Sequence, residues 1–187
     1  ELDWAVFGKK LAQLHLIEGK FFGLDHDNYI GSLEQINKEC GAWSEFYTNH
    51  RLLNLTAKAR DQGLFEKKHC NWVEKLCQRL DELIPACRPS LIHGDLWSGN
   101  LLIDTSGHPV LIDPAVYYGH PEMDWAMLSL FGSYPVEALD HYQNLHPLEK
   151  GLNERKDIHQ LYPLMVHLIL FGKGYLNGVE STLKKYA

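Results

Sequence analysis

The sequence predicts an α+β fold that is mainly helical and contains one small β element. Apolar residues recur at helical spacing over most of the 187 positions. Three short aliphatic runs, at residues 90–93, 100–104 and 110–113, are bounded by turn formers and are typical of strands. These strands are too few and too short to form a free-standing sheet. With 45% hydrophobic residues, the chain can build a sizeable core, as one domain or as one lobe of a larger protein.

The first half of the chain is predicted to be helical apart from one long loop. Apolar spacing over residues 2–17 indicates a helix, and Gly19 is typical of a helix C-cap. Residues 21–37 contain many turn formers and show no clear period, which predicts a loop. Two amphipathic patterns then predict long helices over residues 42–62 and 67–83.

The second half combines the strands with further helices. Residues 90–93 and 100–104 are predicted as buried strands on either side of a polar loop. Residues 110–113 form a third predicted strand, which pairs with the second in a hairpin. After Pro121, helical patterns return. They cover residues 122–131, 136–145, 154–171 and 175–185.

Charge and composition disfavour several classes of function. The net charge is −6, and Lys and Arg are scattered, so we expect no binding to nucleic acid or to an anionic membrane. The chain shows no basic segment followed by an apolar core at its start and no apolar stretch of membrane-span length, which predicts a cytoplasmic protein. Its four cysteines form no CxxC pair, so we expect reduced, partly buried residues rather than disulfides or zinc ligands.

A polar segment interrupts the predicted strands. The stretch LIHGDLWSGNLLID places His93, Asp95 and Asn100 in the spacing HxDxxxxN, and Asp113 follows Asp95 by 18 positions. Oxygen atoms of Asn100 and Asp113 suit Mg²⁺ bound together with phosphates, and Asp95 is then placed to accept a proton from a hydroxyl. Each residue alone is more often a turn former or a hydrogen-bonded loop residue. Together they are typical of the catalytic and metal loops of kinase-like phosphotransferases.

The wider sequence resembles one family. LIHGDLWSGNLLID, followed by LIDPAVYYGHPEMDWAM, closely resembles the fructosamine kinase family, also called ketosamine 3-kinases, within the aminoglycoside-phosphotransferase-like group. Trp97 in HGDLWSGN and the run DPAxYYGHxE are specific to that family, whereas HGDxxxxN with a later Asp also occurs in antibiotic, choline and homoserine kinases. The stretches DNYIG, WSEFYTNHRL and FGKGYL extend the similarity over nearly the whole chain.

The resemblance implies an architecture and an activity. Residues 1–187 look like the C-terminal lobe of a protein-kinase-like, aminoglycoside-phosphotransferase-like fold, whose small β-hairpin carries the catalytic and metal loops. The sequence has no strand-borne Lys followed by a helical Glu and no glycine-rich hairpin, so we expect the N-terminal nucleotide lobe to lie outside this chain. The implied reaction is ATP- and Mg²⁺-dependent phosphorylation of the C3 hydroxyl of a ketoamine, small or protein-bound, in deglycation repair. The chain alone is expected to be inactive.

The resemblance also implies roles for single residues. Asp95 looks like the catalytic base, and Asn100 and Asp113 look like the Mg²⁺ ligands. His93 is expected to brace the polar loop rather than to react. Asp124 is expected to hold the same loop through backbone hydrogen bonds.

Four residues are candidates for the substrate wall. Trp97 offers an apolar face on which a sugar can stack, although a large ring is also an ordinary core anchor. Tyr117, His120 and Glu122 are weaker candidates, since each in isolation is as readily a helix-entry or turn residue. Residues 166–169 read Val-His-Leu-Ile where the family usually has Asn-His-x-Asn, which leaves the identity of the substrate open.

The sequence leaves three alternatives open. The protein can be another small-molecule kinase of the aminoglycoside and choline kinase type, whose cationic substrate would require an acidic pocket. It can be a non-catalytic sugar-binding remnant. A metal-dependent hydrolase using His93, Asp95, Asp113 and His120 is disfavoured because the helical His pair or acidic cluster of such sites is missing. The sugar, the amine and the oligomeric state are not determined by the sequence.

Overall fold

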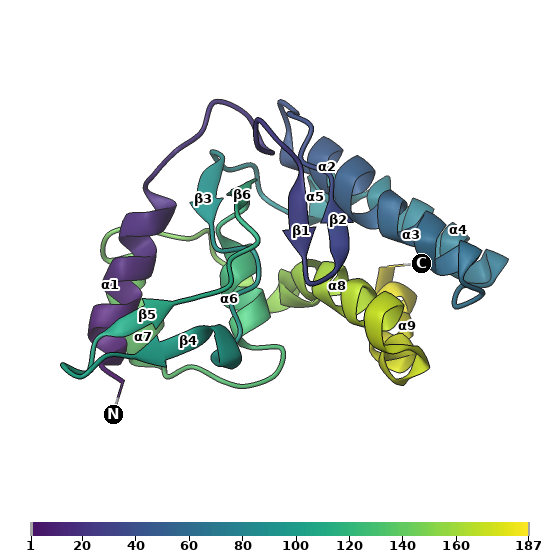
Figure 1. Ribbon diagram of the computed structural model, residues 1–187. Helices are drawn as coiled ribbons and strands as arrows, with labels where there is room; N and C mark the ends of the chain where they lie inside the picture. The colour runs from purple at the N-terminus through teal and green to yellow at the C-terminus, as the bar shows by residue number, and fades with distance from the viewer. Residues whose placement is uncertain (1, 187) are drawn as a thin grey trace.

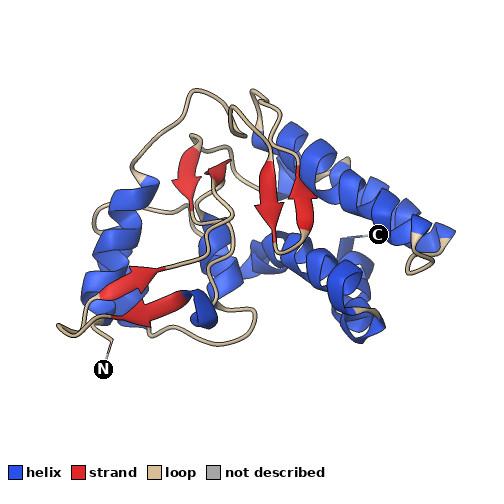
Figure 2. Cartoon of the chain, in the orientation of Figure 1, coloured by secondary structure: helices blue, strands red, loops and turns tan. Residues whose placement is uncertain are grey.

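A computed structural model describes residues 2–186 and confirms a mainly helical α+β fold (Figure 1). The helices are α1 (Trp4–His15), α2 (Trp43–Phe46), η1 (Tyr47–Leu52), α3 (Leu53–Asp61), α4 (Lys67–Cys77), α5 (Leu80–Leu83), η2 (Ser98–Asn100), α6 (Glu122–Leu128), α7 (Val136–Gln143), α8 (Leu152–Phe171), η3 (Lys173–Tyr175) and α9 (Leu176–Tyr186). The strands are β1 (Asn28–Ile30), β2 (Leu33–Gln35), β3 (Ser90–Ile92), β4 (Leu101–Ile103), β5 (Pro109–Leu111) and β6 (Tyr117–Gly119). Figure 2 shows helices around these short strands, which form three separate antiparallel pairs within residues 2–186.

Buried side chains form two cores. The smaller core joins α1, α6 and α7, and its buried residues include Phe7, Leu11, Leu96, Trp125 and Tyr142. The larger core lies among α2–α5, α8 and α9 and extends to β3 and β6. Burial of one large apolar side chain stabilises a fold by about 1.5–3 kcal/mol. Because Leu96 belongs to the polar loop (residues 93–100), its burial in the smaller core anchors that loop.

The predicted hairpin of β4 and β5 is confirmed, but its predicted burial is wrong. The two strands pair antiparallel, with Leu102 opposite Val110. Leu102 and Ile103 are 48% and 49% exposed. Leu101 and its partner Leu111 pack against the smaller core, and Pro109 is buried at the start of β5, so the hairpin is anchored at these positions while its other apolar side chains face outward.

Two other strand pairings were not predicted. Residues 21–37 are not a loop throughout, because β1 and β2 form an antiparallel hairpin around Gly31, whose φ is +57°. Strand β6 pairs with β3, with Tyr117 opposite Ile92. Strands of three residues are too short to show the alternation that identifies a strand in sequence.

The helices follow the predicted ranges with two interruptions. Residues 42–62 are helical, but a π-helix over Tyr47–Leu52 lies between α2 and α3. Residues 67–83 break between α4 and α5. The four C-terminal helices α6 to α9 each begin within two residues of the predicted start.

Side-chain amides fasten the β1–β2 hairpin to the segment after β5. Nδ2 of Asn28 donates to the backbone oxygen of Val116 at 2.8 Å. Nε2 of Gln35 donates to the backbone oxygen of Ala115 at 3.2 Å, and its Oε1 accepts from the hydroxyl of Tyr162 at 2.7 Å. These bonds fix the hairpin relative to both the segment after β5 and helix α8.

Within residues 2–186 no helix has the length and apolar character needed to cross a membrane. The four cysteines are free thiols in the structure; Cys40 is buried and the other three are partly buried.

Candidate active site

The polar loop, the β1–β2 hairpin, the segment after β5 and helix α8 line a pocket of about 550 Å³. The polar loop contributes Asp95, Trp97 and Asn100, and the segment after β5 contributes Asp113. The structure therefore brings together four of the predicted site residues. The other lining residues are Tyr29, Ile30, Gly31, Pro114, Ala115, Val166, His167, Leu170 and Phe171.

Asp95 and Asn100 are joined directly. The short turn η2 returns the chain so that Nδ2 of Asn100 donates to the backbone oxygen of Asp95 at 2.9 Å and to its Oδ2 at 3.1 Å. Both bonds use the amide nitrogen of Asn100. Its Oδ1 is therefore the atom left to bind a cation at the pocket wall.

The start of the polar loop is held from two sides. Asp124, fully buried in the first turn of α6, accepts the backbone N–H of His93 at Oδ2 (2.8 Å) and that of Gly94 at Oδ1 (2.9 Å). Gly94 has φ +81°, and a Cβ there would lie 2.1 Å from the backbone oxygen of Ala115, so this position requires glycine. Nε2 of His93 donates to the backbone oxygen of Ile112 at 2.9 Å. His93 and Asp124 thus lie where loop-supporting residues were expected.

The environment of Asp95 shifts the pKa of its carboxyl. Burial raises the pKa of the Asp95 carboxyl above its usual range, although His93, His167 and the hydrogen bond from Asn100 act in the opposite direction. A carboxylate with a raised pKa is a stronger base at neutral pH than an exposed one. Asp95 therefore has the electrostatic character of a proton acceptor.

Asp113 adopts an unusual backbone conformation. Its φ is +53°, the one positive value at a non-glycine position within residues 2–186. The flanking backbone is fixed to the polar loop. The N–H of Ile112 donates to the backbone oxygen of Asn100 at 3.0 Å, and that of Ala115 donates to the backbone oxygen of His93 at 2.9 Å. Left-handed backbone at a non-glycine residue costs about 1 kcal/mol or more and clusters at functional sites.

The donor set of the pocket fits Mg²⁺. The carboxylate of Asp113 and the amide oxygen of Asn100 are hard oxygen ligands, and both residues line the same pocket as Asp95. Mg²⁺ usually takes one or two protein oxygens and completes its shell with phosphates and water. Asn100 and Asp113 would be the residues that hold the ion.

An aromatic rim, formed by Tyr29, Trp97 and Phe171, lies at the same pocket. Trp97 is 39% exposed and so is not a core anchor; a Cβ at Gly99 would lie 2.3 Å from its ring. Tyr29 and Phe171 are 64% and 67% exposed and were not identified from the sequence. Both lie in stretches that carry the family resemblance, DNYIG and FGKGYL, and this is the signal that could have found them.

Tyr117, His120 and Glu122 do not line this pocket, contrary to the expected substrate wall. Each is at most 2% exposed. Pairing of β6 with β3 draws Tyr117 into the larger core, where its ring centroid lies 4.1 Å from the guanidinium carbon of buried Arg51. His120 and Glu122 follow at the buried junction with α6. All three side chains are buried and therefore contribute to the packing of the fold and not to the pocket wall.

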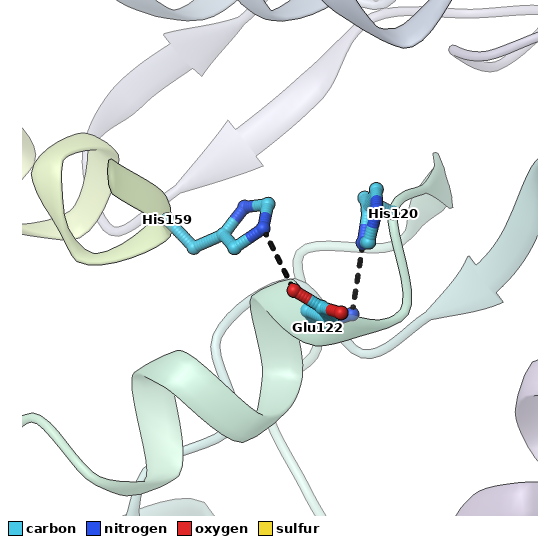
Figure 3. Close-up of side chains that lie close together, drawn as sticks. All are labelled: His120, Glu122 and His159. Carbon is cyan, nitrogen blue, oxygen red and sulfur yellow. Dashed lines mark hydrogen bonds and ion pairs between the residues drawn. The ribbon is translucent and has the colours of Figure 1, made fainter. Parts of the chain in front are cut away.

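Glu122 lies in a buried cluster with His120 and His159 (Figure 3). Nε2 of His159 is 3.3 Å from Oε2 of Glu122, and Nδ1 of His120 accepts the backbone N–H of Glu122 at 3.2 Å. Arg155 of α8 binds both carboxylate oxygens, with Nε donating to Oε2 at 2.7 Å. These residue types also occur in metal sites, but Arg155 already supplies the positive charge. We interpret the cluster as a charge-balanced joint between α6 and α8.

This joint predicts a pH effect on stability. Burial lowers the pKa of His120 to about 3, so this ring stays neutral in the folded chain but takes up a proton on unfolding below pH 6.5. The free energy of unfolding should therefore fall as pH decreases from 6.5, by up to about 1.4 kcal/mol per pH unit. Denaturant unfolding at several pH values between about 6.5 and 5 gives the pH dependence of the free energy of unfolding. This dependence should be less steep in His120→Gln than in wild type, by the amount that corresponds to about one proton. His26→Gln, at an exposed position, is the control; equal slopes in wild type and His120→Gln would contradict the prediction.

Comparison with known proteins supplies relatives of this chain. A family model described as fructosamine kinase matches residues 1–187. A probable ketoamine kinase of Lactiplantibacillus plantarum is 40% identical, with 99% of this chain and 70% of the relative covered. A probable ketoamine kinase of Enterococcus faecium is 39% identical, with 94% of this chain and 64% of the relative covered. A chloroplastic protein-ribulosamine 3-kinase of Arabidopsis thaliana is 36% identical, with 97% of this chain and 56% of the relative covered. The chain thus spans between about half and 70% of the length of these relatives.

Solved structures are similar over the same residues. A crystal structure of a candidate fructosamine-3-kinase from Thermobifida fusca has a TM-score of 0.92 and 40% identity, with 97% of this chain and 63% of that chain covered. The ADP-bound aminoglycoside phosphotransferase APH(2'')-Ib has a TM-score of 0.54 at 14% identity, over 97% of this chain and 62% of that one, which shows a shared fold alone. Because the family match runs through every residue of the chain and agrees with both relatives and structures, the chain belongs to the fructosamine kinase family.

Proposed function

We propose that this chain is the substrate- and metal-binding lobe of an ATP-dependent ketoamine 3-kinase. The reaction transfers the γ-phosphoryl group of ATP to the C3 hydroxyl of a fructosamine or ribulosamine, small or protein-bound. The observation that carries the proposal is that Asp95, Asn100 and Asp113 line one pocket in a chain of this family. Relatives named ketoamine kinase and protein-ribulosamine 3-kinase support the substrate class. Phosphorylation would destabilise the adduct and release the amine, a deglycation repair.

Asp95 is the proton acceptor in this proposal. It accepts the proton of the C3 hydroxyl as that oxygen attacks the phosphorus, and its raised pKa suits it to hold the proton. Asn100 fixes the carboxylate through its amide nitrogen, and Asp124 fixes the loop that carries it. Trp97 provides an apolar face for the sugar at the pocket entrance.

Asn100 and Asp113 would hold Mg²⁺ through their oxygens. When bound, this ion neutralises the charge on the transferring phosphoryl group. The left-handed backbone of Asp113 and the two flanking backbone hydrogen bonds to the polar loop fix the segment that carries the carboxylate, so this part of the backbone does not have to reorganise during the reaction.

We propose further that the nucleotide lobe is supplied by sequence outside residues 1–187. The relatives are longer than this chain, and a kinase-type site needs a Lys for the phosphates and a loop that covers them. An open, solvated pocket would weaken each electrostatic contact with ATP. The complete protein is therefore the form in which activity should be measured.

The other candidate functions are less compatible with the pocket. Asp95 and Asp113 are its sole acidic lining residues among those the structure describes, and both are used by the phosphoryl transfer, which leaves no carboxylate for the ammonium groups of an aminoglycoside. A hydrolase site using His93 and His120 has no geometric basis, because neither side chain lines the pocket.

The proposal is tested by assay of the full-length protein with Mg-ATP. We expect phosphorylation of a model fructosamine or ribulosamine, with the phosphate located on O3 by NMR spectroscopy. An aminoglycoside and choline serve as competing acceptors. Turnover of either of these without turnover of ketoamines would reject the substrate class, and absence of any transfer would favour a non-catalytic sugar-binding role.

Asp113→Ala is expected to raise the Mg²⁺ concentration needed for half-maximal activity by at least about tenfold. The substitution removes a metal ligand, and even loss of a ligand's supporting partner costs about 10- to 100-fold in metal affinity. Titration of Mg²⁺ at fixed ATP measures the shift. Asp104→Ala is a matched control, since Asp104 caps the β4–β5 turn and does not line the pocket. An unchanged Mg²⁺ requirement in Asp113→Ala would make Asp113 a structural turn residue.

A further inference from the structure

Asp124 has a third contact besides the two backbone amides of the polar loop. Nε2 of His15, at the last residue of α1, lies 3.1 Å from Oδ2 of Asp124. Both side chains are completely buried. His15 is 109 positions away from Asp124 in sequence and lines no part of the pocket, so nothing in the proposed reaction has used it so far.

We propose that His15 is a positioning residue for the polar loop: it orients the carboxylate of Asp124, which in turn holds the amides of His93 and Gly94 and places Asp95. The bond from His15 fixes Oδ2, the same oxygen that accepts the N–H of His93. With Oδ2 fixed, Oδ1 is directed to the N–H of Gly94. The order of contacts therefore runs from α1 through α6 to the loop that carries the base.

The direction of each hydrogen bond follows from the chemistry of the partners. Burial disfavours the charge on Asp124, but the contact with His15 and the amide of His93 lower the pKa of this carboxyl below its usual range. An ionised carboxylate only accepts hydrogen bonds, so Nε2 of His15 donates. In the neutral ring, Nδ1 of His15 then accepts from the hydroxyl of Tyr142, which is 2.7 Å away and also fully buried. Tyr142 of α7 thereby selects the ring tautomer that can serve Asp124.

The position of His15 has an ordinary explanation as well. A His in the last turn of a helix can simply interact with the helix dipole. Such a residue is normally exposed and needs no partner at either ring nitrogen. Here both nitrogens are bonded and the side chain is inaccessible to water, so loss of the ring would leave an oxygen of Asp124 short of a donor in a low-dielectric site.

Two amide substitutions separate positioning from packing. The side-chain nitrogen of Gln takes the place of the His Nε2, whereas that of Asn takes the place of Nδ1. His15→Gln therefore keeps the donor to Asp124, and His15→Asn loses it while remaining polar. His69→Asn is the matched control, because His69 is equally buried but bonds to Glu180 at 2.7 Å on the other side of the fold, between α4 and α9.

The first measurement is native-state amide exchange in the full-length protein, which does not depend on any activity. His15→Asn should speed exchange over residues 93–96 by about tenfold or more, because a hydrogen bond to an ionised group is worth at least that factor. Exchange in α4 and α9 should be unchanged. Exchange in His15→Gln should remain close to that of wild type. His69→Asn should speed exchange in α4 and α9 and leave exchange over residues 93–96 unchanged. Equal exchange over residues 93–96 in His15→Asn and wild type would overturn the proposal, as would equal effects of Asn and Gln.

The catalytic consequence rests on the proposed function. His15→Asn should lower kcat for a ketoamine by about tenfold or more and change its KM by less than about threefold, since His15 acts on the base and not on the bound sugar. His15→Gln should restore most of kcat. If the protein phosphorylates no ketoamine, the proposed function fails while the exchange experiment still decides the role of His15. A kcat for His15→Asn equal to that of wild type, in an active protein, would reject the link to Asp95.

Discussion

Asp95→Asn is expected to reduce ketoamine turnover by about 10²- to 10⁴-fold, the usual contribution of a positioned general base. An amide cannot accept the proton of the attacking hydroxyl at neutral pH. The amide has nearly the shape of the carboxylate and can still accept from Nδ2 of Asn100 through its oxygen, so the loop should keep its conformation. KM for the ketoamine should change little, because Asp95 is proposed to act mainly in the transition state.

The measurement is steady-state kinetics of the full-length protein with a model fructosamine or ribulosamine. Asp104→Asn is the control, since it makes the same chemical change in the β4–β5 turn outside the pocket. In the proposed mechanism the base is ionised Asp95, so wild-type activity should rise with pH through the pKa of this carboxyl, which burial raises above its usual value. Turnover by Asp95→Asn within a few-fold of wild type would reject the role of base.

Glu122→Leu should lower the free energy of unfolding by about 3–5 kcal/mol, the cost of removing one partner from a buried ion pair. Glu122 is 1% exposed, and its partner Arg155 is 7% exposed. With the carboxylate gone, the guanidinium would remain buried with backbone oxygens of Glu149 and Lys150 as its partners. Because this joint links α6 to α8, its loss should destabilise the whole fold rather than one end.

Urea unfolding of wild type, Glu122→Leu and the double variant Glu122→Leu/Arg155→Met measures this effect. The double variant should recover much of the loss, because it removes the uncompensated charge. Burial alone would raise the pKa of Glu122, but contacts with His159 and Arg155 lower it to about 2. The contribution of the carboxylate is therefore complete above about pH 4.5 and lost as pH falls toward 2. A loss of less than about 1 kcal/mol at neutral pH would show that the joint contributes little.

The sequence predicts those parts of the site that depend on local order. Asp95 and Asn100 lie five positions apart in one loop, and the β4–β5 hairpin connects that loop to Asp113. Short connections of this kind leave few alternative arrangements. The proximity of these three residues could therefore be predicted from their spacing, and the long helices could be predicted from their periodicity.

The parts that depend on remote partners could not be predicted. Tyr29 reaches the pocket because Asn28 bonds to Val116, 88 positions away, and nothing in three-residue strands indicates that pairing. Tyr117 was expected at the pocket, yet its pairing with Ile92 turns it into the core. In the sequence, His15 is an ordinary histidine in the last turn of a helix. Its contact with Asp124, 109 positions away, is evident only in the folded structure.

The left-handed backbone of Asp113 has a consequence for attempts to engineer this protein. Glycine accepts φ +53° without strain, so Asp113→Gly relieves the backbone at the same step that deletes the carboxylate. A selection for heat resistance alone would accept such a change, since it rewards the folded state and does not test turnover. Libraries screened for robustness would accumulate well-folded, inactive proteins at this position. Any directed evolution of this scaffold should therefore hold residue 113 fixed or couple every round to a phosphorylation assay.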